Sequence, residues 1–229
     1  MKTQPFLLTA ALLGVLPALN AAVITESYTF NVGSTAGDIP DFGSATFSQL
    51  ISASQIVQLT EVRVSLDLKG TSAAPGWAGD MFVSLNRDLG TQTAVLLNQV
   101  GVTGVDSLGF GYNGWNVVFK DSAANGDVHL GQPTAPATIL TGSWQPDGRL
   151  SPSGSSRTAL LDVFNSAAAN STWYLHVADL SSSGTMTLNS WTLSFTGDTS
   201  SSVPEPQHFA AFAGASLLGF ALVRRFIRR

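Results

Sequence analysis

The chain has 229 residues, of which only 11% are charged, and its formal net charge at pH 7 is −4. It contains no cysteine, which excludes disulfide bonds and thiolate chemistry. Four of its eleven basic residues lie at the C-terminal end, so the rest of the chain is more acidic than the net charge alone indicates. A phosphate-binding surface needs clustered lysine and arginine, and this distribution argues against nucleic acid as a partner.

Residues 1–22 have the layout of a secretory signal peptide. The basic residue Lys2 precedes an apolar run over 6–16, and small residues follow at Ala21 and Ala22. This order predicts cleavage after one of the two alanines. The apolar run is shorter than the about 20 residues that a spanning helix needs, which favours a cleaved signal over an uncleaved anchor. The sequence therefore predicts export of the region that follows.

Residues 23–198 carry a hydrophobic pattern with a period of two. Within 60–68, valine and leucine alternate with polar residues, which places the apolar side chains on one face of a strand. The same alternation recurs around Trp173 and Trp191, so we expect both indoles to face the core. Shorter runs predict further strands at 27–32, 45–51, 82–85, 94–97 and 117–119.

Turn-forming residues separate these runs, as at Pro75-Gly76, Asn113-Gly114 and Asn125-Gly126. Many short strands with one-sided apolar faces predict an all-β fold, and specifically a β-sandwich that forms a single domain. The stretch 156–169 is compatible with a helical turn or with a cap on one end of the sandwich, and the pattern does not choose between them.

Residues 199–229 combine three elements in a fixed order. A Ser/Thr-rich stretch leads to a Pro-Glu-Pro motif, an apolar segment over 208–223 predicts a transmembrane helix, and arginines close the chain. The apolar segment is somewhat shorter than a hydrocarbon core of about 30 Å. We therefore expect the long arginine side chains to extend from the end of the helix to the lipid headgroups. Basic residues stay on the cytoplasmic side, which orients the preceding domain outward. The residues of this expected motif are Val203, Pro204, Glu205, Pro206, Arg224, Arg225, Arg228 and Arg229.

This order of Pro-Glu-Pro, short apolar helix and arginine cluster resembles the PEP-CTERM sorting signal of Gram-negative bacteria. The resemblance implies that an exosortase-type enzyme recognises and processes the tail. It also implies transit through the inner membrane, followed by delivery to the cell envelope, the cell surface or the extracellular matrix. An ordinary tail anchor with a proline-containing linker is the alternative, and in both cases we expect membrane tethering at some stage.

A second resemblance covers most of the exported region, from about Ile39 to Gly197. Segments 171–179 and 184–195 resemble the closing hairpin of the P domain (P/Homo B domain) found beside subtilisin-like proprotein convertases. Earlier segments resemble the same family in order: Ile39-Pro40-Asp41, Ile56 to Leu68, Gly79-Asp80-Met81, Phe119 to Ala123 and Trp144-Gln145-Pro146. The resemblance implies a jelly-roll β-sandwich that partners other modules and is not itself catalytic.

The chain also departs from the P-domain pattern. The histidine that often precedes the Gly-Asp-Leu strand of that family is missing, and 71–78 reads as a Gly/Pro/Ala-rich insertion. Asn86-Arg87 stands where the family commonly has Ser-Pro. These departures leave the sandwich in place but remove the basis for inheriting a ligand site.

We expect no catalytic residues. His129 lies in a polar, loop-like stretch, His176 projects from the polar face of a strand, and His208 lies at the entrance of the tail helix. No serine occupies a Gly-x-Ser-x-Gly nucleophile pattern. The aspartates are scattered in turns, where carboxylates usually accept backbone N–H groups. The sequence therefore predicts a protein that is not an enzyme.

Two weaker hypotheses concern ligands. Asp121, Asn125 and Asp127 carry oxygen-bearing side chains in one loop and are candidate ligands for calcium, which takes several oxygen ligands; no other cofactor is expected. Trp77, in the Gly/Pro-rich insertion, and Trp115, in a Gly/Asn-rich loop, are candidate stacking platforms for a sugar. Buried packing is the alternative for both tryptophans.

Together these features predict an exported cell-surface or extracellular-matrix protein that acts in adhesion or in the assembly of a biofilm or exopolysaccharide matrix. The alternative is a carbohydrate-binding module for extracellular polysaccharide. A secreted hydrolase is the least favoured reading.

Overall fold

The computed structural model describes residues 22–33, 36–70, 75–90, 92–133, 138–182 and 184–199. All of these belong to one compact unit. The expected signal peptide, except for Ala22, lies outside the described residues, as do the Pro-Glu-Pro motif, the helix 208–223 and the arginines. Within the described ranges, no helix is long and apolar enough to cross a membrane.

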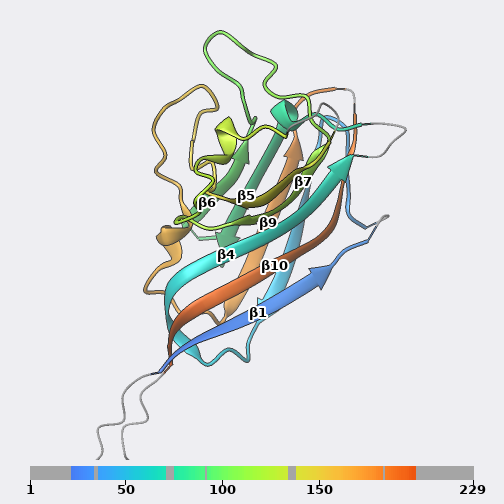
Figure 1. Cartoon of the computed structure of the whole chain (residues 1–229). Helices are drawn as coiled ribbons and strands as arrows, with labels where there is room; N and C mark the ends of the chain where they lie inside the picture. The colour runs from blue at the N-terminus through green and yellow to red at the C-terminus, as the bar shows by residue number, and fades with distance from the viewer. Residues whose placement is uncertain are drawn as a thin grey trace, which may run out of the picture. The chain divides into compact units, whose positions relative to one another are not determined.

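The described strands form two sheets (Figure 1). One sheet has the order β1–β10–β4–β7–β8, with β2 also beside β10, and the other has the order β3–β9–β5–β6. Every pairing is antiparallel except that of β7 with β8. The strands are β1 (Val23–Asn31), β2 (Asp38–Ile39), β3 (Ser44–Ile51), β4 (Ile56–Gly70), β5 (Met81–Arg87), β6 (Thr93–Asn98), β7 (Gly114–Phe119), β8 (Leu140–Trp144), β9 (Ser171–Asp179) and β10 (Met186–Thr199), and the 3₁₀ helices are η1 (Ala78–Asp80), η2 (Val128–Leu130) and η3 (Leu161–Phe164).

The core lies between the two sheets and follows the predicted alternation. On β4 the apolar residues from Val62 to Leu68 are buried at every second position. Trp173 of β9 and Phe195 of β10 come from different sheets, and their ring centroids lie 5.0 Å apart. Trp173 and Trp191 are both buried, as predicted. The prediction of an all-β fold with sandwich architecture is confirmed.

The stretch that the sequence left open, 156–169, contains the short 3₁₀ helix η3. Its Leu161 and Phe164 are buried, and the ring of Phe164 lies edge-on to Trp173 at 5.0 Å. The segment therefore contains a helical turn and also covers part of the core. The sequence did not predict β2 or β8, which are the two shortest strands.

The two ends of the described domain lie side by side. The Thr199 N–H donates to the Ala22 carbonyl at 2.9 Å, and the Ala22 N–H donates to the Thr199 hydroxyl at 3.2 Å. The η1 helix and the connection between β6 and β7 lie at the opposite end of the sandwich (Figure 1). Any extension beyond either end of the domain thus leaves from the same place.

Candidate functional site

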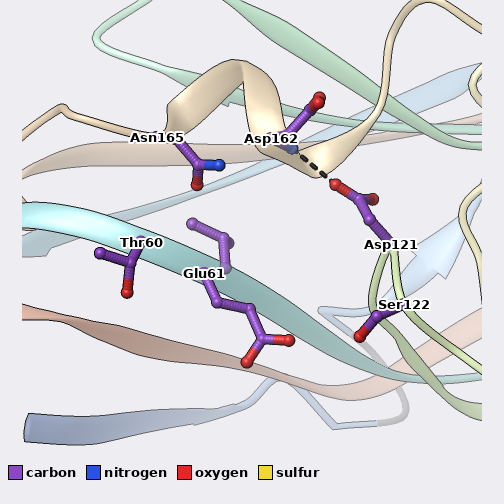
Figure 2. Close-up of a pocket in the computed structure, with 7 residues that line it drawn as sticks. Thr60, Glu61, Asp121, Ser122, Asp162 and Asn165 are labelled. Atoms are coloured by element: carbon purple, nitrogen blue, oxygen red, sulfur yellow. Dashed lines mark hydrogen bonds between the residues drawn. The ribbon is translucent and has the colours of Figure 1, made fainter.

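A cavity of about 340 Å³ lies beside the first half of β4. Three segments line it: β4, the turn that follows β7, and the η3 segment (Figure 2). The lining residues are Thr60, Glu61, Val62, Asp121, Ser122, Asp162 and Asn165.

Asp121 holds two of these segments together. One of its carboxylate oxygens accepts the N–H of Leu161 at 3.1 Å. The other accepts the N–H of Asp162 at 2.7 Å (Figure 2). Burial raises the pKa of Asp121, and the two backbone N–H groups offset part of that rise. The carboxylate therefore has a structural partner on each oxygen and positions the η3 segment over the cavity.

The cavity offers polar groups of several kinds. Carboxylates come from three segments, and Thr60, Ser122 and Asn165 add hydroxyl and amide groups. Arg63 neutralises Glu61, with nitrogen–oxygen distances of 2.6 and 2.8 Å. The volume falls at the small end of the about 300–1,000 Å³ that ligand sites occupy. The lining is thus polar, but two of its three carboxylates, Glu61 and Asp121, already have protein partners.

The cavity lining has no histidine. A serine nucleophile needs an adjacent base, and Ser122 lacks one among the lining residues. His176 lies on β9, where its ring nitrogen Nδ1 is 3.1 Å from the Thr46 hydroxyl. Among the described lining residues, Ser122 therefore has no neighbouring histidine.

A second feature is a buried network of charged side chains beside β6. Asp147 is fully buried and contacts the ring of His129 at 2.7 Å and the guanidinium of Arg149 at 3.2 Å. Arg149 also contacts Asp127 at 2.6 Å, and Arg157 lies 3.6 Å from the same Asp127 oxygen. Buried charges are tolerated only when they are paired and hydrogen-bonded, as all of these are.

His129 lies between two hydrogen-bond acceptors. Its Nδ1 faces a carboxylate oxygen of Asp147, and its Nε2 faces the carbonyl oxygen of Val102 at 2.9 Å. Burial by itself lowers the pKa of His129. The hydrogen bond and the charge of Asp147, together with the Val102 carbonyl, raise this pKa by more than burial lowers it, so the net shift is upward. Both ring nitrogens donate at once only in the imidazolium form, which these two acceptors therefore stabilise.

A third feature is a group of carboxylates where β5 begins and β9 ends. Burial, with smaller contributions from Asp179 and Asp41, raises the pKa of Asp80 to about 6. Burial likewise raises the pKa of Asp179, with Asp41 adding to the shift. The structure thus brings together aspartates from three of the short motifs on which the P-domain resemblance rests.

The two carboxylates proposed for calcium have different protein partners. Asp121 binds the backbone of the η3 segment, whereas Asp127 accepts the N–H of His129 at 3.0 Å and the guanidinium of Arg149. The Asn125 side chain lies near Gly142. In the described part of the chain, no group of three or more histidine, cysteine, aspartate or glutamate side chains is arranged to hold a metal ion. Both carboxylates therefore have protein partners, and calcium binding by these residues stays a prediction.

The two candidate stacking tryptophans differ sharply. Trp115 is fully buried in β7, and its indole N–H donates to the Tyr112 hydroxyl at 3.0 Å, so it has no face available to a sugar. Trp77 is 41% exposed. Its indole N–H donates to the Leu108 carbonyl at 2.8 Å, and its ring lies against Gly111. Only Trp77 is placed where an external ligand can reach it.

The buried charged network was not predicted from the sequence. A signal for it existed, because Gln145-Pro146-Asp147-Gly148-Arg149 places two opposite charges beside a turn in a chain where only 11% of residues are charged. The cavity was not predicted either, because Glu61 and Asp121 are 60 positions apart and only the fold joins their segments.

Comparison with known proteins gives no family assignment. The chain matches no protein-family model and no curated protein. Among solved structures it is similar to a complex of an Aeromonas sobria serine protease with its chaperone, with 17% identity over 78% of this chain and a TM-score of 0.43. A structure of the Aeromonas sobria serine protease is similar to it with 18% identity over 80% of this chain and a TM-score of 0.41. The chain spans only 28% of the length of each of these neighbours.

Proposed function

We propose that this chain is an exported, non-enzymatic protein of the cell surface or extracellular matrix that a PEP-CTERM-type tail delivers. The observation that carries the proposal is the order of the last elements: Pro204-Glu205-Pro206, the apolar segment 208–223, and arginines from Arg224 to Arg229. Three elements in this order are far more specific than a Pro-Glu-Pro tripeptide alone. The signal peptide at 1–22 is the matching requirement for export.

The geometry of the sandwich supports this proposal. Ala22 and Thr199 lie together, so a tail that follows Thr199 tethers the domain by one end. The η1 helix and the connection between β6 and β7, with the exposed Trp77 beside them, lie at the other end (Figure 1). In this proposal the domain is a P-domain-like jelly roll displayed at the cell surface or in the matrix, where it acts in adhesion or in matrix assembly.

The tail is tested by intact-mass analysis of the surface form in a host with an exosortase-type enzyme. The proposal expects a mass that lacks Arg224 to Arg229 and a protein found outside the inner membrane. Replacing Glu205 and Pro206 by alanine should trap the full-length chain in the membrane fraction. Replacing Ser201 and Ser202 by alanine, in the same linker, is the matched control and should change nothing. A surface form that retains the arginines contradicts processing of the tail.

A binding role for the exposed end is the second candidate function, and the exposure of Trp77 favours it. An indole that is held at its N–H by Leu108 and packed on Gly111 is a preorganised platform for a sugar ring. A glycan array of extracellular polysaccharides, read with wild type and Trp77→Ala, tests this role. Trp144→Ala, which removes a half-buried indole elsewhere, is the control. Equal retention of every glycan by wild type and Trp77→Ala contradicts it.

A further inference from the structure

The strand β1 has an open outer edge. It forms one side of its sheet and pairs only with β10, in a register that runs unbroken from Val23 to Asn31. Within the described ranges, no backbone group of these residues hydrogen-bonds to a chain segment other than β10. The edge is therefore a regular row of backbone donors and acceptors without a partner strand among the described residues.

The register shows which backbone groups face outward. The Thr199 N–H donates to Ala22 and the Val32 N–H donates to Asn189, so the even-numbered residues of β1 form the hydrogen-bonded pairs with β10. The N–H and C=O groups of the odd-numbered residues consequently point away from the sheet. These residues are Val23, Thr25, Ser27, Thr29 and Asn31, and the side chains of all five are exposed.

This edge has few of the features that normally prevent strand addition. Proteins protect free edges with lysine, proline, a bulge, an inward-pointing charged residue or a covering loop, and of these β1 carries only the inward-pointing charge of Glu26. β1 contains no lysine, arginine, proline or glycine, and its pairing with β10 has no bulge. Its single charge, Glu26, is held by the Tyr28 hydroxyl at 2.7 Å and by the Gln55 N–H at 3.0 Å. The edge is thus long, regular and nearly uncharged.

The β1 sequence is complementary to itself when reversed about Ser27. In that register Ile24 opposes Phe30, Thr25 opposes Thr29, and Glu26 opposes Tyr28, the residue whose hydroxyl it already binds. The odd-numbered residues become the hydrogen-bonded pairs, as the outward direction of their backbone groups requires. Thr25, Ser27 and Thr29 already form hydroxyl pairs of 2.8 to 2.9 Å across the β10 interface, and the same pairing would continue across the new one.

We propose that β1 pairs antiparallel with β1 of a second copy of this chain, about a two-fold axis at Ser27, and joins two sheets into one. Such an interface is isologous, because the same strand serves both subunits. Shifting the axis by one residue toward the N-terminus would bring Glu26 opposite Glu26, and shifting it toward the C-terminus would oppose Glu26 to Phe30. Like charges in opposed positions are destabilising, which disfavours the first shift, and of the three registers only the one about Ser27 opposes Glu26 to Tyr28, whose hydroxyl it binds.

The neighbouring edge strand β3 is less suited to this role. Among the described strands it also pairs on one side only, with β9. Reversal about Phe47 places the exposed Leu50 against Ser44 and Ala45 against Gln49, so apolar and polar side chains are mismatched. β3 therefore serves as the comparison strand in the experiment.

Cysteine cross-linking of the full chain in mild detergent tests the proposal directly, because the native sequence has no cysteine. Ser27→Cys places two thiols at the axis, within the about 7 Å Cα separation that a disulfide tolerates, and should give a covalent dimer under mild oxidation. Ser194→Cys is the matched control: it lies beside Ser27 but one strand further from the axis. We expect at least about tenfold more dimer from Ser27→Cys, because the control thiols are held roughly three strand spacings apart.

The register has its own test. Thr25→Cys alone and Thr29→Cys alone should remain uncross-linked, whereas an equimolar mixture of the two should form a mixed dimer. A covalent dimer from Ser48→Cys on β3 that exceeds the one from Ser27→Cys overturns the proposal, and so does equal dimer from Ser27→Cys and Ser194→Cys.

A variant without cysteine separates pairing from oxidation. Ser27→Lys places two like charges at the axis while leaving the β10 pairing intact, and Ser194→Lys is its control. Sedimentation velocity should show a concentration-dependent dimer for wild type and for Ser194→Lys, and a monomer for Ser27→Lys, with equal thermal melts for the two variants. A wild-type chain that stays monomeric, or that assembles only by binding another protein's strand, overturns the proposal.

Discussion

The sandwich has two flanks, one at the edge strand β6 and one at the edge strand β1, and they differ in whether another segment covers the edge. At the β6 flank the outer edge is covered: Val95 donates to Ala159, and Asp147 and Gly148 donate to carbonyls of β6 at 2.9 to 3.0 Å. The buried network around Asp147 lies at this cover. At the β1 flank no described segment hydrogen-bonds to the backbone edge, and the inward side chains of β1 are only half-buried. The fold thus covers the backbone edge of β6 with a loop that carries buried charged residues, whereas the backbone edge of β1 has no partner among the described residues.

Removing the central charge of the covered flank should have the largest effect. Asp147→Ala leaves His129 and Arg149 buried without their shared carboxylate, and breaking a buried ion pair costs about 3–5 kcal/mol of unfolding free energy. Urea unfolding measures the loss. Glu26→Gln on the open flank keeps a hydrogen-bond acceptor and should cost less than about 1 kcal/mol. Equal losses at the two positions would show that the flanks are not energetically different.

A smaller effect is expected from the glycine that turns the covering loop. Gly148 has φ +69°, and a Cβ there would lie 2.6 Å from Leu160, whereas Gly33, beyond the end of β1, has φ +83° and open space. Gly33→Ala should cost about 1 kcal/mol from backbone strain alone, and Gly148→Ala about 1–2 kcal/mol, because the contacted Cδ2 end of the half-buried Leu160 side chain must also move aside. Thermal melts of the two variants compare them, and a larger loss for Gly33→Ala contradicts the difference between the flanks.

The covered flank should also respond to pH. The folded pKa of His129 is raised above its unfolded value, so its stabilising contribution is complete below the unfolded pKa and is lost as pH rises through the folded pKa. The melting temperature should therefore fall as the pH is raised from 6 through the folded pKa of His129. His129→Gln, which keeps a polar side chain, should remove this part of the pH dependence. If the melting temperature of His129→Gln depended on pH as that of the wild type does, the site would not stabilise the imidazolium form of His129.

Asp80 lies outside both flanks and provides the control for the pH test. Its pKa is raised to about 6, so the folded state binds a proton more readily than the unfolded state and is stabilised as pH falls below 6. Asp80→Asn should be more stable than wild type at pH 7 and should lose the gain on acidification. The pH range in which His129 titrates lies above that of Asp80. A variant that combines Asp80→Asn with His129→Gln should therefore show neither the pH dependence from Asp80 nor the one from His129. A wild-type profile in Asp80→Asn contradicts the assignment.

The smallest effect is expected on the open flank. Thr25→Lys changes an exposed side chain whose hydroxyl bonds only to Thr196, and the unfolding free energy should change by less than about 1 kcal/mol. The same substitution should weaken self-association, because it places a lysine at a free edge. A large loss of monomer stability would mean that this flank is covered after all.

The sequence predicted the regular part of the fold and little of its surroundings. Alternation within 60–68 and around Trp173 and Trp191 sufficed for the strands and for the buried side of each, because burial of one face imposes a period of two. It did not predict β8, whose pairing is parallel and whose sequence Leu140–Trp144 contains a glycine and only two apolar residues.

The candidate sites were predicted less well, for a physical reason. Trp115 follows an Asn-Gly turn, which suggested exposure, but it is the second residue of a central strand and faces the core. Asp121 and Asp127 are close in sequence, yet each binds a different distant segment, the η3 backbone and Arg149. Such partners are brought together by tertiary structure, which local spacing does not encode.

Amide hydrogen exchange of the full chain tests the central claim, an open β1 edge beside a covered β6 edge, most directly. At low concentration the amides of Ser27 and Thr29 should exchange rapidly, while those of Tyr28 and Gly148 are protected. At high concentration the Ser27 and Thr29 amides should become protected as well, and Gly148 should not change. Slow exchange at Ser27 at the lowest concentration, equal to that at Gly148, would contradict the account.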